Sequence, residues 1–144
     1  QLGPGVAHYL EVQTALAEDD PAAAAQAAQD ALAALGGVDM KLVEGDAHMA
    51  WMKNANALKS SFSNIAESGK LETQRKEFLL LSEELISVLK RFGVPDGKLY
   101  QAWCPMAFDN DGAAWLQDQE EIENPYYGEA MLKCGEVRKV LGGR

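Results

Sequence analysis

The sequence has few cysteines and few basic residues, and each shortage argues against certain classes of site or binding partner. It holds two cysteines among 144 residues, which permits one disulfide, and no Cys-x-x-Cys motif that would indicate a thioredoxin-like redox site. Thirteen Lys and Arg stand against 22 Asp and Glu, giving a formal charge of −9, and no basic run is present. Because phosphate contacts need clustered Lys and Arg, this balance argues against nucleic-acid binding.

Long apolar runs are also missing. No stretch approaches the ~20 apolar residues that span a bilayer, and no charged-then-apolar leader is present, so we expect no direct membrane insertion. The chain begins QLGPG without a methionine, and we interpret it as a mature or excised segment. Glycine-rich phosphate loops, a Ser-centred elbow and a complete calcium loop are absent as well, so no catalysis is predicted.

The size and the apolar content fit one domain spanning residues 1–144. The apolar fraction is 47%, and a chain of 144 residues can bury about two-thirds of the surface that its unfolded form exposes. A hydrophobic core can therefore form without a disulfide or a metal ion.

Four segments have the apolar spacing of amphipathic helices. They cover residues 4–17, 21–35, about 46–66 and 71–92, and the ESGK sequence at 67–70 breaks the third from the fourth. Asp20 and Pro21 suit the N-cap and first position of the second helix, and glycines follow the second and fourth. Short connections predict an antiparallel up-down four-helix bundle over about residues 4–93, a mainly α fold.

The sequence changes character over residues 95–144. KLYQAWCPM alternates, DNDG indicates a turn, and AAWLQ has the pattern of a return strand. NPYYG indicates another turn, and EAMLKCGEVRKVL favours a short helix that Gly135 interrupts. We expect a short hairpin plus a short helix, packed on one end of the bundle.

The sulfur residues of this segment occur as two pairs. On a strand Cys104 and Met106 face the same side, and on a helical turn Met131 and Cys134 share a face. Thiolate and thioether ligands select soft ions, above all Cu(I) and by extension Ag(I). The spacing alone leaves three interpretations open: a metal site, a Cys104–Cys134 disulfide, or inert thiols in a core.

An argument from topology adds histidine to this set. In an alternating bundle the first and third helices begin at the end where the fourth finishes and the tail starts. His8, His48, Met49 and Met52 would then lie at the same end as Cys104, with Met40 in the preceding loop. We therefore add His48 as a candidate metal ligand, although a histidine in this position also suits a core or a cap.

Two stretches carry a resemblance to a known family. CPMAFDNDGAAWLQ and IENPYYGEAMLKCGEV resemble a domain of unknown function in bacterial envelope proteins. That domain is fused to the C-terminus of periplasmic adaptor (membrane fusion) subunits of heavy-metal efflux pumps of the resistance-nodulation-division type, and it occurs as stand-alone exported proteins. YLEVQTALAEDD and QRKEFLLLSEEL are similar to it more loosely.

The resemblance implies a periplasmic module that serves copper and silver export and holds an ion or passes it to an efflux adaptor or pump. It carries over Cys104, Met106, Met131 and Cys134 as metal ligands. The chain has no adaptor hairpin or barrel, which leaves association with a pump open. An interaction module with a structural Cys104–Cys134 disulfide and no metal is the alternative, and a thiol enzyme is a third. We expect Trp103, Trp115 and Tyr126 to shield the metal site from water.

Overall fold

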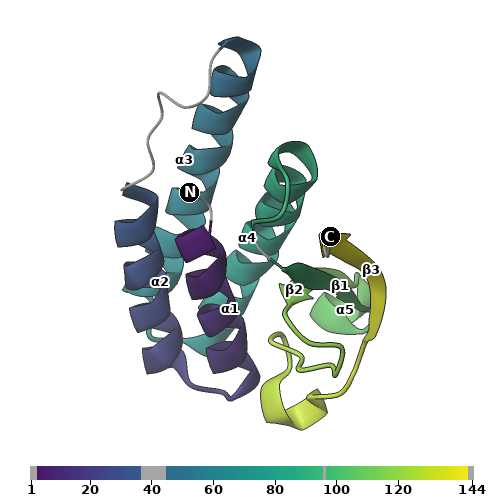
Figure 1. The fold of residues 1–144 in the computed structure, drawn as a ribbon. Helices are drawn as coiled ribbons and strands as arrows, with labels where there is room; N and C mark the ends of the chain where they lie inside the picture. The colour runs from purple at the N-terminus through teal and green to yellow at the C-terminus, as the bar shows by residue number, and fades with distance from the viewer. Residues whose placement is uncertain (1–2, 37–44, 96, 143–144) are drawn as a thin grey trace.

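Four long helices run antiparallel and pack side by side (Figure 1). The computed structural model describes residues 3–36, 45–95 and 97–142, without the side chains of residues 45–48. The predicted helical segments and the mainly α fold are confirmed. Among the described residues, no helix is long and apolar enough to span a bilayer. The helices are α1 (Gly3–Ala17), α2 (Pro21–Gly36), α3 (Gly45–Glu67) and α4 (Leu71–Phe92).

The helix ends follow from local sequence. The Asp20 carboxylate accepts a hydrogen bond from the Ala23 backbone N–H at 3.0 Å, which caps α2 just before Pro21. At the end of α4, Gly93 takes a positive φ of 94°, and its N–H donates to the Leu89 carbonyl at 2.9 Å. Both helix boundaries were predicted from these residue types.

The core lies between the helices and is built from the predicted apolar stripes. Burying a large apolar side chain contributes about 1.5–3 kcal/mol, so these stripes hold the helices together. The second helix contributes alanines, whose short side chains let it approach its neighbours closely. The fully buried or nearly buried residues include Trp51, Leu58, Phe62 and Ile65 of α3, Phe78, Leu81 and Val88 of α4, and Ala24, Ala28 and Ala31 of α2.

A three-stranded antiparallel sheet follows the helices, in the order β2-β1-β3. The hairpin of β1 and β2 was predicted, and Cys104 pairs with Ala113 where the two strands turn. Between them lies α5 (Ala107–Asn110), a single turn over part of the DNDG signal. The strands are β1 (Lys98–Cys104), β2 (Ala113–Gln117) and β3 (Glu136–Gly142).

The third strand was not predicted. The expected short helix is present as a 3-10 turn, η2 (Gly128–Met131), but the chain from Glu136 onward forms β3 and pairs with β1. Gly135 has a φ of 134°, which ends any helical path and turns the chain towards the sheet. The sequence EVRKVLG then supplies two β-branched valines, Val137 and Val140, which favour a strand.

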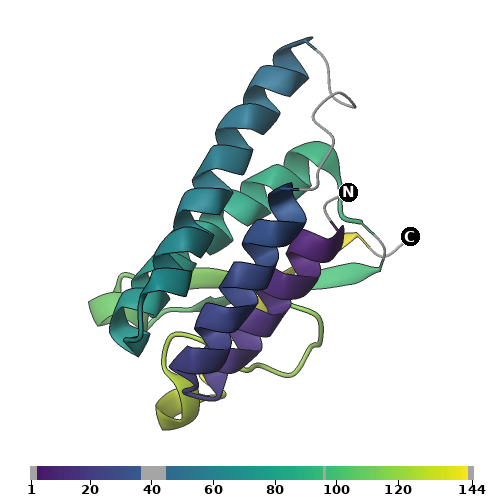
Figure 2. The same cartoon turned by 90° about the vertical axis from the view of Figure 1, so that its left-hand side faces the viewer.

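The sheet lies against the flank formed by α1 and α4, whereas we expected the tail at one end of the bundle. Figure 2 shows the strands running across the helices. The Leu116 N–H of β2 donates to the Tyr9 hydroxyl of α1 at 3.0 Å, and that hydroxyl lies 2.6 Å from the Ser82 hydroxyl of α4. Tyr9 is 0% exposed, so this polar contact is enclosed at the junction of all three elements.

A second polar junction fixes the loop that follows β2. The Arg75 guanidinium of α4 donates to the Pro125 carbonyl at 2.8 Å and to the Leu16 carbonyl at 2.9 Å. It also pairs with Asp19 at 2.6 Å, and this cation holds the pKa of the Asp19 carboxyl below its usual range. The other Asp19 oxygen accepts the Glu129 N–H at 3.2 Å. The loop that carries the second cysteine is thus tied to both α1 and α4.

Candidate thiol site

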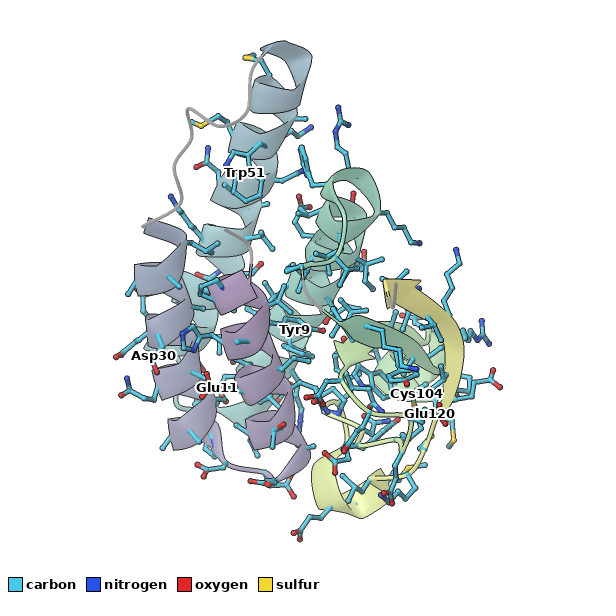
Figure 3. All side chains as sticks on the ribbon, viewed as in Figure 1. Tyr9, Glu11, Asp30, Trp51, Cys104 and Glu120 are labelled. Carbon is cyan, nitrogen blue, oxygen red and sulfur yellow. The ribbon has the colours of Figure 1, made fainter. Side chains whose placement is uncertain are left out.

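The first cysteine is held by the sheet. Cys104 is the last residue of β1, the central strand, and it is 0% exposed. The ladders to β2 and β3 leave the end of β1 little freedom to shift. Figure 3 labels Cys104 within the sheet region, below the upper part of the bundle.

The second cysteine comes from the loop between η2 and β3. The Cys134 N–H donates to the Met131 carbonyl at 3.0 Å, which closes a turn immediately after η2. Its side chain is half-buried. The next residue, Gly135, packs so closely that a Cβ there would lie 3.0 Å from both the Trp103 carbonyl and the Trp115 ring.

The two sulfurs are 3.2 Å apart, although thirty positions separate the residues in sequence. A disulfide bond is about 2.05 Å long, so the pair is in contact as free thiols. The predicted convergence of the cysteines is therefore present in the structure. Two thiols at this distance can share a proton, hold a soft ion, or oxidise to a disulfide.

The surroundings of Cys134, the half-buried member of the pair, favour its protonated form. The hydrogen bond with Cys104 raises the pKa of the Cys134 thiol, and desolvation raises it further. A reactive catalytic cysteine instead needs a pKa lowered by a nearby cation or a helix N-terminus. The interpretation as a thiol enzyme gains no support from this environment.

Several aromatic residues lie in the segments that carry the pair. Tyr126 is buried and meets Trp115 edge-on at 5.8 Å between ring centroids, while Trp103 is half-buried beneath the Arg138 guanidinium at 5.0 Å. The Tyr127 hydroxyl donates to the Met106 carbonyl at 2.5 Å. Burial raises the pKa of Tyr127, and negative charge on Cys104 or Cys134 raises it further. The aromatic residues predicted to shield a metal ion therefore lie in this region.

The turn after Cys104 has an uncommon backbone. Phe108, Asp109 and Asn110 all have positive φ, at 52°, 55° and 70°. Asp and Asn tolerate this left-handed region, but for phenylalanine it costs about 1–3 kcal/mol. The Phe108 ring packs edge-on against Tyr126 at 5.3 Å, which offsets part of that cost. The backbone beside Cys104 is thus held in a defined shape.

The two candidate methionines lie in the turns that adjoin the cysteines. Met106 follows Cys104 by two residues at the start of α5 and is 45% exposed. Met131 ends η2 and is half-buried. Among the described residues there is no group of three or more His, Cys, Asp and Glu that could hold an ion. Within the part of the chain that the structure describes, the two thiols are thus the donors brought into contact, and Met106 and Met131 are the candidate thioethers nearest to them in sequence.

The predicted histidine falls on a part of α3 whose side chains are not described. The side chain of His48 lies outside the described residues, so its role as a ligand stays a prediction. Trp51, three residues later on α3, is labelled far above Cys104 in Figure 3. Between the end of α4 and Cys104, the seven residues of β1 carry the chain about 20 Å across the flank.

The other described residues of the argument from topology are elsewhere. Met49 and Met52 are exposed on α3, at 71% and 39%, and the His8 ring pairs with Glu11 on its own helix. Met40 lies outside the described residues.

Comparison with known proteins identifies a family. Residues 6–97 match the model of a family described as protein of unknown function (DUF3347). The chain belongs to this family. The match covers the four helices and ends just before β1, so the cysteine segment of this DUF3347 protein lies outside it. No curated protein and no solved structure matches the chain.

Sequence reasoning missed the residue that organises the second half of the site. Asn124 is 0% exposed, and its side-chain N–H donates to the Cys134 carbonyl at 2.8 Å. Its Oδ1 accepts the N–H groups of Tyr126 and Tyr127 at 2.7 and 3.1 Å. NPYYG was interpreted only as a turn, although an asparagine that bonds to the backbone two residues on is a recognised turn motif.

Asn124→Asp separates the role of this side chain as a hydrogen-bond donor from its role as an acceptor. The carboxylate can still accept both tyrosine N–H groups, but it turns an oxygen towards the Cys134 carbonyl. We expect the free energy of unfolding to fall by about 1–3 kcal/mol at pH 7. Burial and this repulsion raise the pKa of the new carboxyl in the folded state, so the loss should shrink as the pH falls and the protonated form donates again.

Urea unfolding of the variant at neutral and mildly acidic pH measures this effect. Asn110→Asp is the matched control, since Asn110 is exposed. Its free energy of unfolding should change by no more than about 0.5 kcal/mol. An Asn124→Asp loss that does not change with pH would contradict the donor role of the amide.

Proposed function

We propose that this protein binds one soft monovalent ion, Cu(I) or Ag(I), between the Cys104 and Cys134 thiolates. The single observation that carries the proposal is the 3.2 Å separation of two free sulfurs held by different elements. A prepared pair of thiols binds a soft ion with little loss of conformational entropy, and thiolate is the ligand that such ions prefer.

The thioethers of Met106 and Met131 complete the coordination in this proposal. Each lies within three residues of a cysteine, in a turn whose backbone is hydrogen-bonded to the site. The half-buried position of Cys134 gives an ion access from solvent, while the buried Trp115 and Tyr126 exclude water from the inner side. Exclusion of water protects Cu(I) from oxidation.

The biological setting follows from the resemblance of the last third of the chain to domains of efflux adaptors. We place the protein in the periplasm, as a module that supports heavy-metal efflux or resistance without catalysis. Its metal ion is cargo that is held or handed to an adaptor or pump protein. The 22 acidic residues outnumber the 13 basic residues, and the resulting negative charge favours attraction of cations to the surface.

A second candidate function uses the same sulfur pair without a metal. If Cys104 and Cys134 form a permanent disulfide, the hairpin and the Cys134 loop become a stapled scaffold that presents NPYYG to a partner protein. The proximity of the sulfurs favours this candidate too. The two candidates differ in whether the thiols remain free in the isolated protein.

Anaerobic titration with Cu(I) in the presence of competing Cu(I) chelators tests the first proposal. We expect one ion per chain, two reactive thiols before addition and none after it, and no comparable protection by Zn(II). Zinc prefers four Cys or His ligands, which this pair cannot supply. Thiols that stay reactive in excess Cu(I) would exclude the metal site, and an absence of free thiols from the outset would support the staple.

A further inference from the structure

The two cysteines differ sharply in accessibility although their sulfurs touch. Cys104 is 0% exposed at the end of the central strand, and Cys134 is half-buried in a loop. A reagent from solvent can reach the Cys134 sulfur, whereas the Cys104 sulfur is reached only through its partner. Their 3.2 Å contact is close enough for one sulfur to attack the other.

We propose that the pair forms a reversible disulfide in which Cys134 reacts first with an external disulfide and Cys104 then resolves it. This disulfide closes the metal site. The effect on metal binding rests on the proposed function, but the order of reaction rests only on burial and distance.

The exchange balances in two steps when the oxidant is a disulfide, RSSR. The Cys134 thiolate attacks one sulfur of RSSR, forms a mixed disulfide and releases RS⁻. The Cys104 thiolate then attacks the Cys134 sulfur, forms the Cys104–Cys134 bond and releases the second RS⁻. The two thiol protons end on two RSH, and the two electrons of the pair reduce RSSR.

The backbone allows the small movement that closure needs. The sulfurs must approach by about 1.2 Å to reach the length of a disulfide bond. Cys104 is fixed by its pairing with Ala113 of β2, next to Trp103, which pairs with both outer strands. The movement therefore falls to Cys134, which lies between a single turn and Gly135. Once both sulfurs are bonded to each other, neither can act as a thiolate ligand, and Cu(I) has no site.

The aromatic disulfide DTNB, which releases a coloured thiol, tests the order of reaction. For the metal-free wild type we expect two coloured thiols per chain from one DTNB consumed, and no adduct mass at the end. Cys104→Ser should release one and keep the adduct on Cys134. Cys134→Ser should react at least about tenfold more slowly while folded, and release one thiol promptly in urea, because burial shields Cys104.

Two further measurements keep the test independent of how well the variants fold. Mass spectrometry of the wild type, quenched early, should place the transient adduct on the Cys134 peptide. Thermal unfolding checks that each variant is folded. An early adduct on Cys104, or a wild type that ends with two adducts, would overturn the inference.

The effect on metal binding is measured on the DTNB-treated wild type. We expect it to lose Cu(I) binding and to regain it fully after a dithiol reductant. If the reduced protein does not bind Cu(I) but the exchange order holds, the proposed function fails and the resolving pair stands. If the reduced protein binds Cu(I) and the oxidised protein binds it equally well, the proposal that the disulfide closes the metal site is wrong.

Discussion

Gly112→Ala is expected to lower the free energy of unfolding by about 2–5 kcal/mol. Gly112 precedes β2 with a φ of 82°, a left-handed conformation that costs a side chain about 1–2 kcal/mol. A Cβ there would also lie 2.1 Å from the Trp103 ring. Relieving that overlap by moving the ring adds about 1–3 kcal/mol.

Gly97 offers a matched control for this prediction. It has nearly the same φ, 83°, but no heavy atom lies within 4 Å of the position of an added Cβ. Gly97→Ala should therefore lower the free energy of unfolding only by the cost of the left-handed backbone, about 1–2 kcal/mol. Urea unfolding with a fitted m-value measures both variants. Equal losses would mean that the Trp103 ring yields without cost.

The same substitution connects stability to the thiol site. Trp103 immediately precedes Cys104 on β1, and its carbonyl lies against Gly135, which follows Cys134. Displacing the Trp103 ring disturbs both segments that carry sulfur. Gly112→Ala should thus slow formation of the Cys104–Cys134 disulfide, whereas Gly97→Ala, at the other end of β1, should leave it unchanged.

The helices could be predicted from the sequence because their signals are local. The stripe from Trp51 to Ile65 repeats at helical spacing and is buried. Asp20 and Gly93 mark boundaries through hydrogen bonds to residues within one turn. Such features need no knowledge of the rest of the chain.

The remainder depends on contacts between distant residues. The strand β3 gains its place by pairing with β1 across about forty positions, and the exposed Val140 gives no clear alternation to reveal it. Asn124 has its role only because the Cys134 carbonyl arrives ten residues later. The convergence of Cys104 and Cys134 was nevertheless predictable as one alternative, since paired sulfur residues at short spacing are unusual.

The position of the sheet on the flank, where the tail was expected at one end of the bundle, has a related cause. Counting helix directions gave the correct end of the bundle for the start of the tail, but the path of β1 across α1 and α4 depends on contacts such as Leu116 with Tyr9. Those contacts join residues more than a hundred positions apart. The sequence alone offered no measure of where β1 would lead.

Cys104→Ser and Cys134→Ser are each expected to weaken Cu(I) binding by at least about a thousandfold, or roughly 4 kcal/mol. A hydroxyl is a hard, neutral ligand, so each variant keeps one thiolate and only the weaker thioether donors. Because the sulfurs are 3.2 Å apart and share any bound ion, the two losses should be nearly equal. Competition with a Cu(I) chelator of known affinity measures them.

Each of the two methionines should contribute less to Cu(I) binding than either cysteine. Met106→Leu and Met131→Leu keep the apolar volume but remove a thioether, so we expect each to weaken binding by about tenfold, or roughly 1.4 kcal/mol. Met52→Leu is the control, since Met52 is exposed on α3 and should leave the affinity unchanged.

For the cysteine variants, a full loss of binding in one with unchanged binding in the other would mean that the ion is held by a single thiol. In that case the contact between the sulfurs would serve the disulfide alone.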